Sequence, residues 1–62
     1  MEKMVLWAWI SMFQHGNLSE EEQIKEIAKI MAEEETGSEE NYTEFLESAE
    51  EEIYWYNWET EK

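Results

Sequence analysis

The stretch MVLWAWISMF, residues 4–13, decides how this chain folds. Nine of its ten residues are apolar, in a 62-residue chain whose formal net charge is −13. The run is too short to span a bilayer, which takes about 20 consecutive apolar residues. It also makes a poor signal peptide, because a single Lys precedes it and no small-residue cleavage site follows. We therefore interpret it as a helix that is apolar on all sides.

The rest of the composition favours helix and solubility. All 17 acidic residues are Glu and all four basic residues are Lys, while Asp, Arg, Pro and Cys are absent. Glu and Lys are strong helix formers, whereas Asp and Pro are poor ones. Without Cys, neither a disulfide nor a thiolate metal site stabilises the fold, and the chain is compatible with a reducing cytoplasm. We expect one soluble domain over residues 1–62, with no targeting signal and an unknown location.

Two glycines divide the chain into three helical segments. Gly16 and Gly37 each follow a helix-compatible run, where a left-handed C-terminal cap is expected. Ser19 begins an S-x-x-E capping box, and Ser38 precedes two Glu residues that suit a first helical turn. Short turns favour antiparallel neighbours, so the sequence predicts an all-α, up-down-up three-helix bundle. The expected helices lie near 2–15, 20–36 and 39–60.

Helical periodicity assigns one core stripe to each segment. These stripes are Leu6, Trp9, Ile10 and Phe13; Ile24, Ile27, Ala28 and Met31; and Tyr42, Phe45, Leu46, Ala49, Ile53 and Tyr56. The first segment has a second apolar stripe on its opposite side, formed by Met4, Trp7, Ala8 and Ser11 and continued by His15. A bundle of this size covers only one side of that helix. We therefore expect the second stripe to face away from the bundle.

The third segment also carries aromatic residues off its core stripe, in its last two turns. Trp and Tyr are enriched at binding hot spots, and contiguous exposed apolar patches usually mark interaction sites. We predict that Trp7 fills a pocket of a partner while Ala8 and Ser11 allow close approach. The predicted partner-binding residues are Met4, Trp7, Ala8, Ser11, Tyr54, Trp55 and Trp58.

Catalysis and metal binding have little support in the sequence. His15 is the only imidazole, and no Ser lies in a nucleophile motif. A di-iron bundle needs Glu-x-x-His on two helices, and no EF-hand loop is present. We therefore expect no enzymatic activity, no catalytic residue, no cofactor and no metal.

The charge indicates which partners suit the chain. A charge of −13 repels nucleic acid and anionic membranes and favours basic surfaces. Glu33 to Glu35, Glu59 and Glu61 also close helices where the macrodipole disfavours anions. An acidic surround of this kind suits a protein target with a basic rim, and we expect the free chain to be a monomer.

The chain resembles de novo designed helical mini-protein binders. The marks are Glu/Lys-only charge, caps at "SEEE" and "SEEN", glycine-punctuated short turns, no Pro or Cys, and aromatic residues off the core. The resemblance implies a rigid helix face presented to a groove or flat epitope of a protein target, which it would block. Two alternatives stay open. One is a natural acidic inhibitor in the cationic groove of a nucleic-acid enzyme, and the other is a self-associating helical oligomer.

Overall fold

The computed structural model describes residues 3–61, and within that range the chain forms three α-helices, one 3-10 helix and no strand. The α-helices are α1 (Lys3–His15), α2 (Glu20–Thr36) and α3 (Leu46–Thr60), and the 3-10 helix η1 (Glu39–Phe45) leads into α3. The all-α three-helix bundle is therefore confirmed. The predicted start of the first helix at residue 2 lies outside the described residues, as do residues 1 and 62 of the predicted domain.

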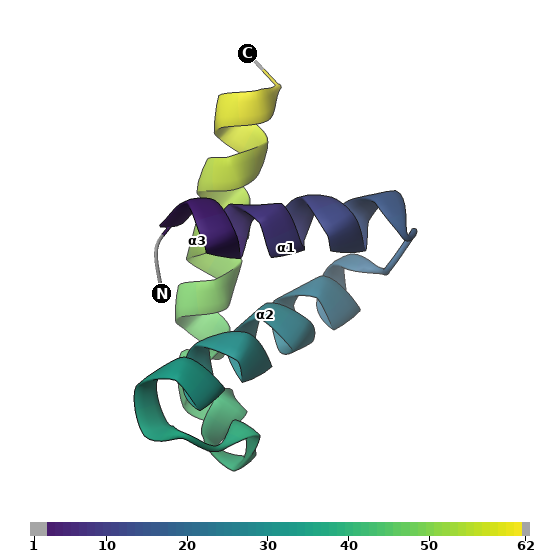
Figure 1. Ribbon diagram of the computed structural model, residues 1–62. Coiled ribbons are helices and arrows are strands. Elements are labelled where there is room, and N and C mark those ends of the chain that lie inside the picture. The colour runs from purple at the N-terminus through teal and green to yellow at the C-terminus, as the bar shows by residue number, and fades with distance from the viewer. Residues whose placement is uncertain (1–2, 62) are drawn as a thin grey trace.

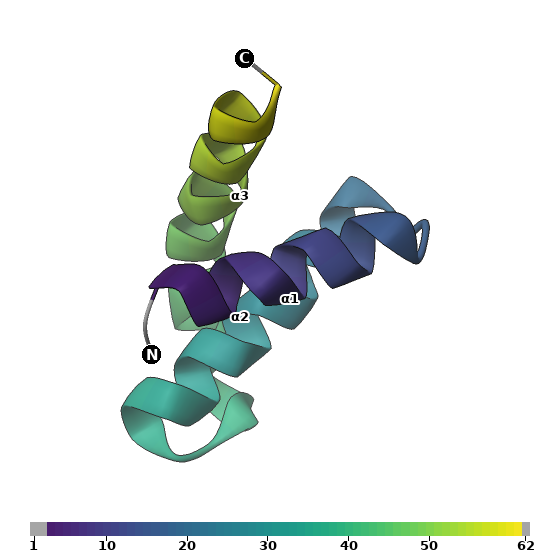
Figure 2. The same ribbon diagram turned by 45° about the horizontal axis from the view of Figure 1, so that its top comes forward.

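The chain reverses direction between α1 and α2, and after η1 it turns again to run upward as α3 (Figure 1). In two views, however, α1 crosses α3 steeply instead of lying along it (Figures 1 and 2). The last turns of α3, drawn in yellow, extend past the point where α1 crosses. Because of this crossing, α1 presents different parts of its circumference to α2 and to α3.

The core lies where the three α-helices meet. Its cluster of buried side chains consists of Leu6, Ile10, Ile27, Ala28, Ala49 and Ile53. Partly buried side chains around it include Ile24, Met31, Tyr42, Phe45, Leu46 and Tyr56. The predicted core stripes of the second and third segments are thus confirmed. In the first segment, Leu6, Ile10 and Phe13 pack in the core as predicted, but Trp9 does not belong to the cluster.

The two glycines end their helices differently. Gly37 has φ 79°, and its N–H donates to the Glu33 carbonyl at 2.8 Å, which is the predicted left-handed cap. The prediction is wrong for Gly16, because the left-handed residue is Asn17 with φ 62°. The Asn17 and Leu18 N–H groups donate to the carbonyls of Gln14 and Phe13, at 3.1 and 3.3 Å. This is a Schellman motif with Asn, the residue that best tolerates left-handed φ after Gly, in the Gly position.

The third segment is not one continuous helix, contrary to the prediction. Ser38 caps its beginning by accepting a hydrogen bond from the Glu40 N–H at 3.2 Å. Asn41 then departs from helical geometry, at φ −93° and ψ 19°, and η1 winds with 3-10 geometry up to Phe45. Regular α-helix begins only at Leu46. η1 packs along α2, and α3 then turns back across the bundle.

Candidate functional site

Trp7 faces the bundle. Its indole Nε1 donates a hydrogen bond to Glu52 Oε2 at 3.2 Å, and its ring meets Tyr56 edge to face, with centroids 5.6 Å apart. The side chain is half-buried and packs against the core cluster. The prediction that Trp7 faces away is therefore wrong. The steep crossing of α1 over α3 gives Trp7 an aromatic neighbour and gives its N–H a carboxylate acceptor.

Trp9 shows the opposite discrepancy. The helical periodicity predicts a place in the core stripe, yet 38% of its surface is exposed. Its ring stacks on Phe13 at a centroid distance of 5.8 Å, which holds the indole against α1 at the edge of the core. Trp9 also lines a shallow groove with Ile30, Glu33 and Glu34 of α2. The core prediction for Trp9 is wrong, because this partly exposed side chain does not belong to the core cluster.

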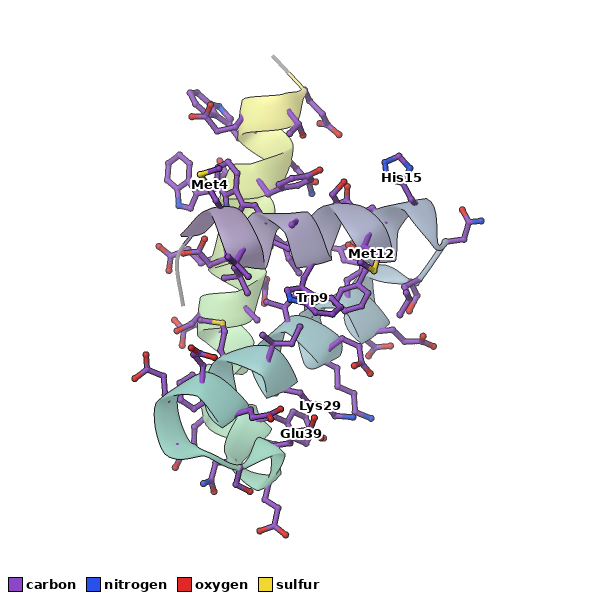
Figure 3. The ribbon with its side chains drawn as sticks, in the orientation of Figure 1. Met4, Trp9, Met12, His15, Lys29 and Glu39 are labelled. Carbon is purple, nitrogen blue, oxygen red and sulfur yellow. The ribbon has the colours of Figure 1, made fainter. Side chains whose placement is uncertain are left out.

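With Trp7 packed against the bundle and Trp9 at the edge of the core, a strip of exposed apolar side chains remains along α1. We define the outer face of α1 as Met4, Val5, Ala8, Trp9 and Met12. Val5, Ala8, Trp9 and Met12 follow the i, i+3, i+4, i+7 spacing of one side of a helix. Met4 is 81% exposed and Met12 58% exposed. In Figure 3 Met4 lies above α1, near its N-terminal end, whereas Trp9 and Met12 lie below it on the side of α2, so Met4 marks one edge of this face.

Sequence reasoning found part of this face. The expected exposure of Met4 and Ala8 is confirmed, whereas Ser11 is half-buried. Val5 and Met12 were missed as members of the exposed face. Their helical spacing with Ala8 is visible in the sequence, but so is the spacing of Met4, Trp7, Ala8 and Ser11. Because no charged residue lies between positions 4 and 13, the sequence does not indicate which of these two sets of side chains faces solvent.

A second exposed group lies on α3 and agrees with prediction. We define the α3 cluster as Tyr54, Trp55 and Trp58, each of which is exposed. Successive rings meet edge to face, with centroids 5.4 Å apart for Tyr54 and Trp55 and 5.9 Å apart for Trp55 and Trp58. The mutual contacts restrict the rings, so the cluster presents aromatic area at low cost in side-chain entropy. Their outward orientation is confirmed, and their part in binding stays a prediction.

Comparison with protein-family models, with characterised proteins and with solved structures gave no match. No helix within residues 3–61 combines the length and the apolar character needed to cross a membrane. Across the same residues, no three His, Asp or Glu side chains are grouped so as to hold a metal ion. The exposed apolar surfaces are thus the features of the described chain that call for a functional explanation.

Proposed function

We propose that the protein binds another protein by inserting the outer face of α1 into an apolar groove of that partner. The observation that carries this proposal is the exposure of Val5, Ala8, Trp9 and Met12 at i, i+3, i+4, i+7 spacing. Anchors at these positions are how an amphipathic helix engages a groove. Met4 extends the same strip toward the N-terminus. Solvent exposure of so many neighbouring apolar side chains is unfavourable unless a partner covers them.

Two features make this face suitable for tight contact. The stacking of Trp9 on Phe13 restricts the indole before binding, so less entropy is lost when it enters a pocket. Ala8 lies in the centre of the strip, where its small side chain lets a partner approach the helix backbone. Trp9 replaces Trp7 as the proposed anchor, because Trp7 is engaged by Tyr56 and Glu52.

Acidic residues beside the anchor suggest the character of the partner. Glu33 and Glu34 of α2 line the shallow groove next to Trp9. A partner with an apolar groove and a basic rim would match both the indole and these carboxylates, and the charges would speed its association. We further propose that the chain is a designed binder that blocks its target. Its helix caps, its Glu/Lys-only charge and its surplus of exposed aromatic side chains support that origin.

The test compares two double variants that add the same charge. Val5→Glu with Met12→Glu places two carboxylates on the outer face of α1. Asn41→Glu with Thr43→Glu adds two carboxylates to exposed positions of η1. Both are compared with the unmodified chain by far-UV circular dichroism and by light scattering after size exclusion, near 0.15 M salt. All three are then screened for binding to an array of purified proteins.

We expect the unmodified chain and both double variants to be helical and monomeric, because all four substituted side chains are exposed. We also expect a partner that binds the unmodified chain and the η1 variant but not the outer-face variant. A partner that tolerates both variants would contradict the proposal. So would a dimer of the unmodified chain that the outer-face variant dissociates, because the face would then be covered by a second copy.

A further inference from the structure

Two of the five side chains on the outer face of α1 carry a thioether sulfur. Met4 is 81% exposed and Met12 is 58% exposed. Met12 follows Trp9 by about one helical turn and lies on the same side of α1, whereas Met4 lies at the edge of the face (Figure 3). A reaction that makes these two sulfur atoms polar therefore changes the surface proposed to bind a partner.

The remaining methionine of residues 3–61 has a different setting. Met31 of α2 is partly buried, packs against the core cluster and lines a small pocket together with Leu6 and Phe45. Oxidation of a sulfur-containing side chain depends on its exposure to the oxidant. The chain contains no Cys, so no thiol of its own competes for that oxidant. Met4 and Met12 are thus the most accessible thioethers in the described part of the chain.

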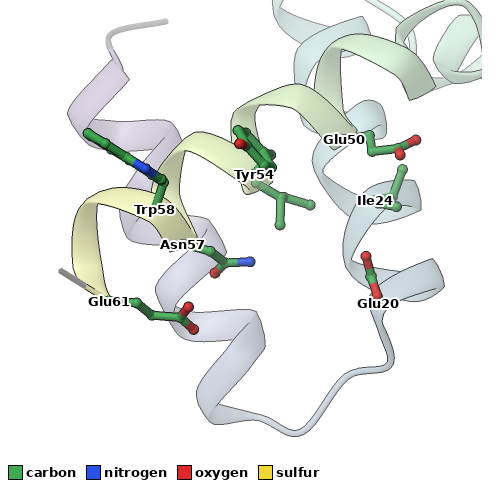
Figure 4. A pocket seen from close by; sticks show the side chains of 8 residues that line it. Glu20, Ile24, Glu50, Tyr54, Asn57, Trp58 and Glu61 are labelled. Atoms are coloured by element: carbon green, nitrogen blue, oxygen red, sulfur yellow. The ribbon is translucent and has the colours of Figure 1, made fainter.

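The second exposed apolar surface carries no thioether. The α3 cluster consists of aromatic side chains alone. The groove between α2 and the C-terminal half of α3, where Figure 4 labels Tyr54 and Trp58, has no Met among its lining residues. Oxidation of methionine would therefore change the outer face of α1 and leave the α3 cluster as it is.

We propose that Met4 and Met12 are sites of reversible oxidation by hydrogen peroxide, and that their oxidation turns off binding through the outer face of α1. The second half of this inference rests on the function proposed for α1. A methionine sulfoxide is polar, and moving a polar group from water into an apolar groove is unfavourable unless the groove offers it a hydrogen bond. The two sulfoxides would thus oppose insertion of α1 into its partner.

The chemistry of the step is a transfer of one oxygen atom. At each methionine an S–O bond forms, the O–O bond of the peroxide breaks, and the second oxygen leaves as water. The sulfur loses two electrons and the peroxide gains them. Methionine sulfoxide reductases, one for each sulfoxide epimer, reverse the step. The sulfoxide oxygen then leaves as water while two thiols form a disulfide.

The first test needs no partner. The folded chain is treated briefly with dilute hydrogen peroxide, digested, and mapped by tandem mass spectrometry. We expect Met4 and Met12 to be oxidised at least about twofold faster than Met31, because they are more exposed. Far-UV circular dichroism should stay unchanged, and both reductases with dithiothreitol should restore the original mass. Oxidation of Met31 or Trp9 as fast as that of Met4 and Met12 would overturn the proposal.

The second test measures the surface of the folded chain by its retention on a phenyl matrix. Oxidation should shorten the retention, and the reductases should restore it. Met4→Leu with Met12→Leu keeps the face apolar and removes both sulfur atoms, so peroxide should leave its retention unchanged. Met31→Leu is the matched control and should respond like the unmodified chain. A response of the Met4→Leu, Met12→Leu variant as large as that of the unmodified chain would overturn the proposal.

The third test uses a partner that binds the unmodified chain through the outer face. Oxidation of Met4 and Met12 should weaken that binding at least about tenfold, because two polar sulfoxides would be buried. Peroxide should change the binding of the Met4→Leu, Met12→Leu variant less than about twofold, since that face carries no thioether.

The outcomes separate this inference from the function proposed for α1. An oxidised chain that binds the partner as tightly as the untreated chain would overturn the switch and leave the function intact. If no partner binds the untreated chain, the function fails and the switch of binding fails with it. The mapping and retention tests then still decide whether Met4 and Met12 are the oxidation sites.

Discussion

Trp7 and Trp9 stand two residues apart on α1, and the bundle treats them in opposite ways. Trp7 lies against α3, with its ring edge on Tyr56 and its N–H donated to Glu52. Trp9 stacks on Phe13 at the edge of the core and exposes 38% of its surface. The same side chain is thus part of the fold at one position and a candidate contact at the other.

The difference between the two tryptophans indicates which interactions orient a helix that is apolar on all sides. Hydrophobic burial is roughly proportional to area and has no direction, so it hardly distinguishes one side of α1 from another. Directional contacts do distinguish them. The Trp7 indole needs an acceptor once it is half-buried, and Glu52 provides one in the observed orientation of α1 across α3.

The largest expected effect tests the comparison directly. Trp7→Ala should lower the free energy of unfolding by about 2–3 kcal/mol, because it removes a packed ring and leaves a cavity beside Tyr56. Trp9→Ala should lower it by less, about 1–2 kcal/mol, since 38% of its surface is already in water. Urea unfolding followed by circular dichroism at 222 nm measures both, without relying on tryptophan fluorescence.

Trp7→Phe serves as the control if Trp7→Ala is too unstable to show a folded baseline. It keeps an aromatic ring at the position and should retain most of the helical signal without denaturant. A loss from Trp9→Ala as large as that from Trp7→Ala would mean that the two faces of α1 are equivalent, and the comparison would fail.

The buried face of each helix could be predicted from the sequence only where charged residues mark its solvent side. In α2, Glu and Lys residues mark the solvent side, so the stripe through Ile27 and Ala28 was correctly identified as buried. In α3, the stripe through Ala49 and Ile53 was found for the same reason, and the exposure of the α3 cluster followed from it. Between residues 4 and 13 of α1 no charge marks the solvent side. The existence of an exposed apolar strip could be predicted from the excess of apolar residues, but its membership could not.

The departure of η1 from α-helical winding was also beyond the sequence. Residues 39–45 contain no Pro or Gly that would signal a break. The irregular residue is Asn41, and its conformation accompanies the packing of η1 along α2. Asn, Tyr, Thr and Phe are weaker helix formers than Glu or Ala, so the local preference for α-helix is modest there, and the contact with α2 is not visible in a single sequence.

A second pair of positions extends the comparison from the two tryptophans to the two glycines, with a smaller effect. Gly37→Ala should lower the free energy of unfolding by about 1–2 kcal/mol, because φ 79° is unfavourable for a residue with a Cβ. At Gly16 a Cβ would meet its nearest neighbours at 3.5 Å, which is ordinary contact, and φ is not left-handed. Gly16→Ala should therefore change stability by less than about 0.5 kcal/mol, or increase it slightly.

Thermal and urea unfolding of the two glycine variants measure this difference. Asn17→Gly provides the matched control at the residue that does have positive φ, and it should not be destabilising. If Gly16→Ala cost as much as Gly37→Ala, the left-handed residue of the first turn would have to be Gly16, as the sequence suggested, and not Asn17.

The smallest expected effect isolates the contact that we hold responsible for the orientation of α1. A double-mutant cycle of Trp7→Phe and Glu52→Ala should give a coupling energy of about 0.5–1 kcal/mol, because the indole N–H and the carboxylate lie in a partly buried setting. The matched cycle of Trp9→Phe and Glu52→Ala should give a coupling near zero. Coupling of Glu52 to Trp9 instead of Trp7 would place the opposite face of α1 against α3. The face proposed for binding would then contain Trp7 instead of Trp9. This coupling energy therefore tests the orientation of α1 on which the functional proposal depends.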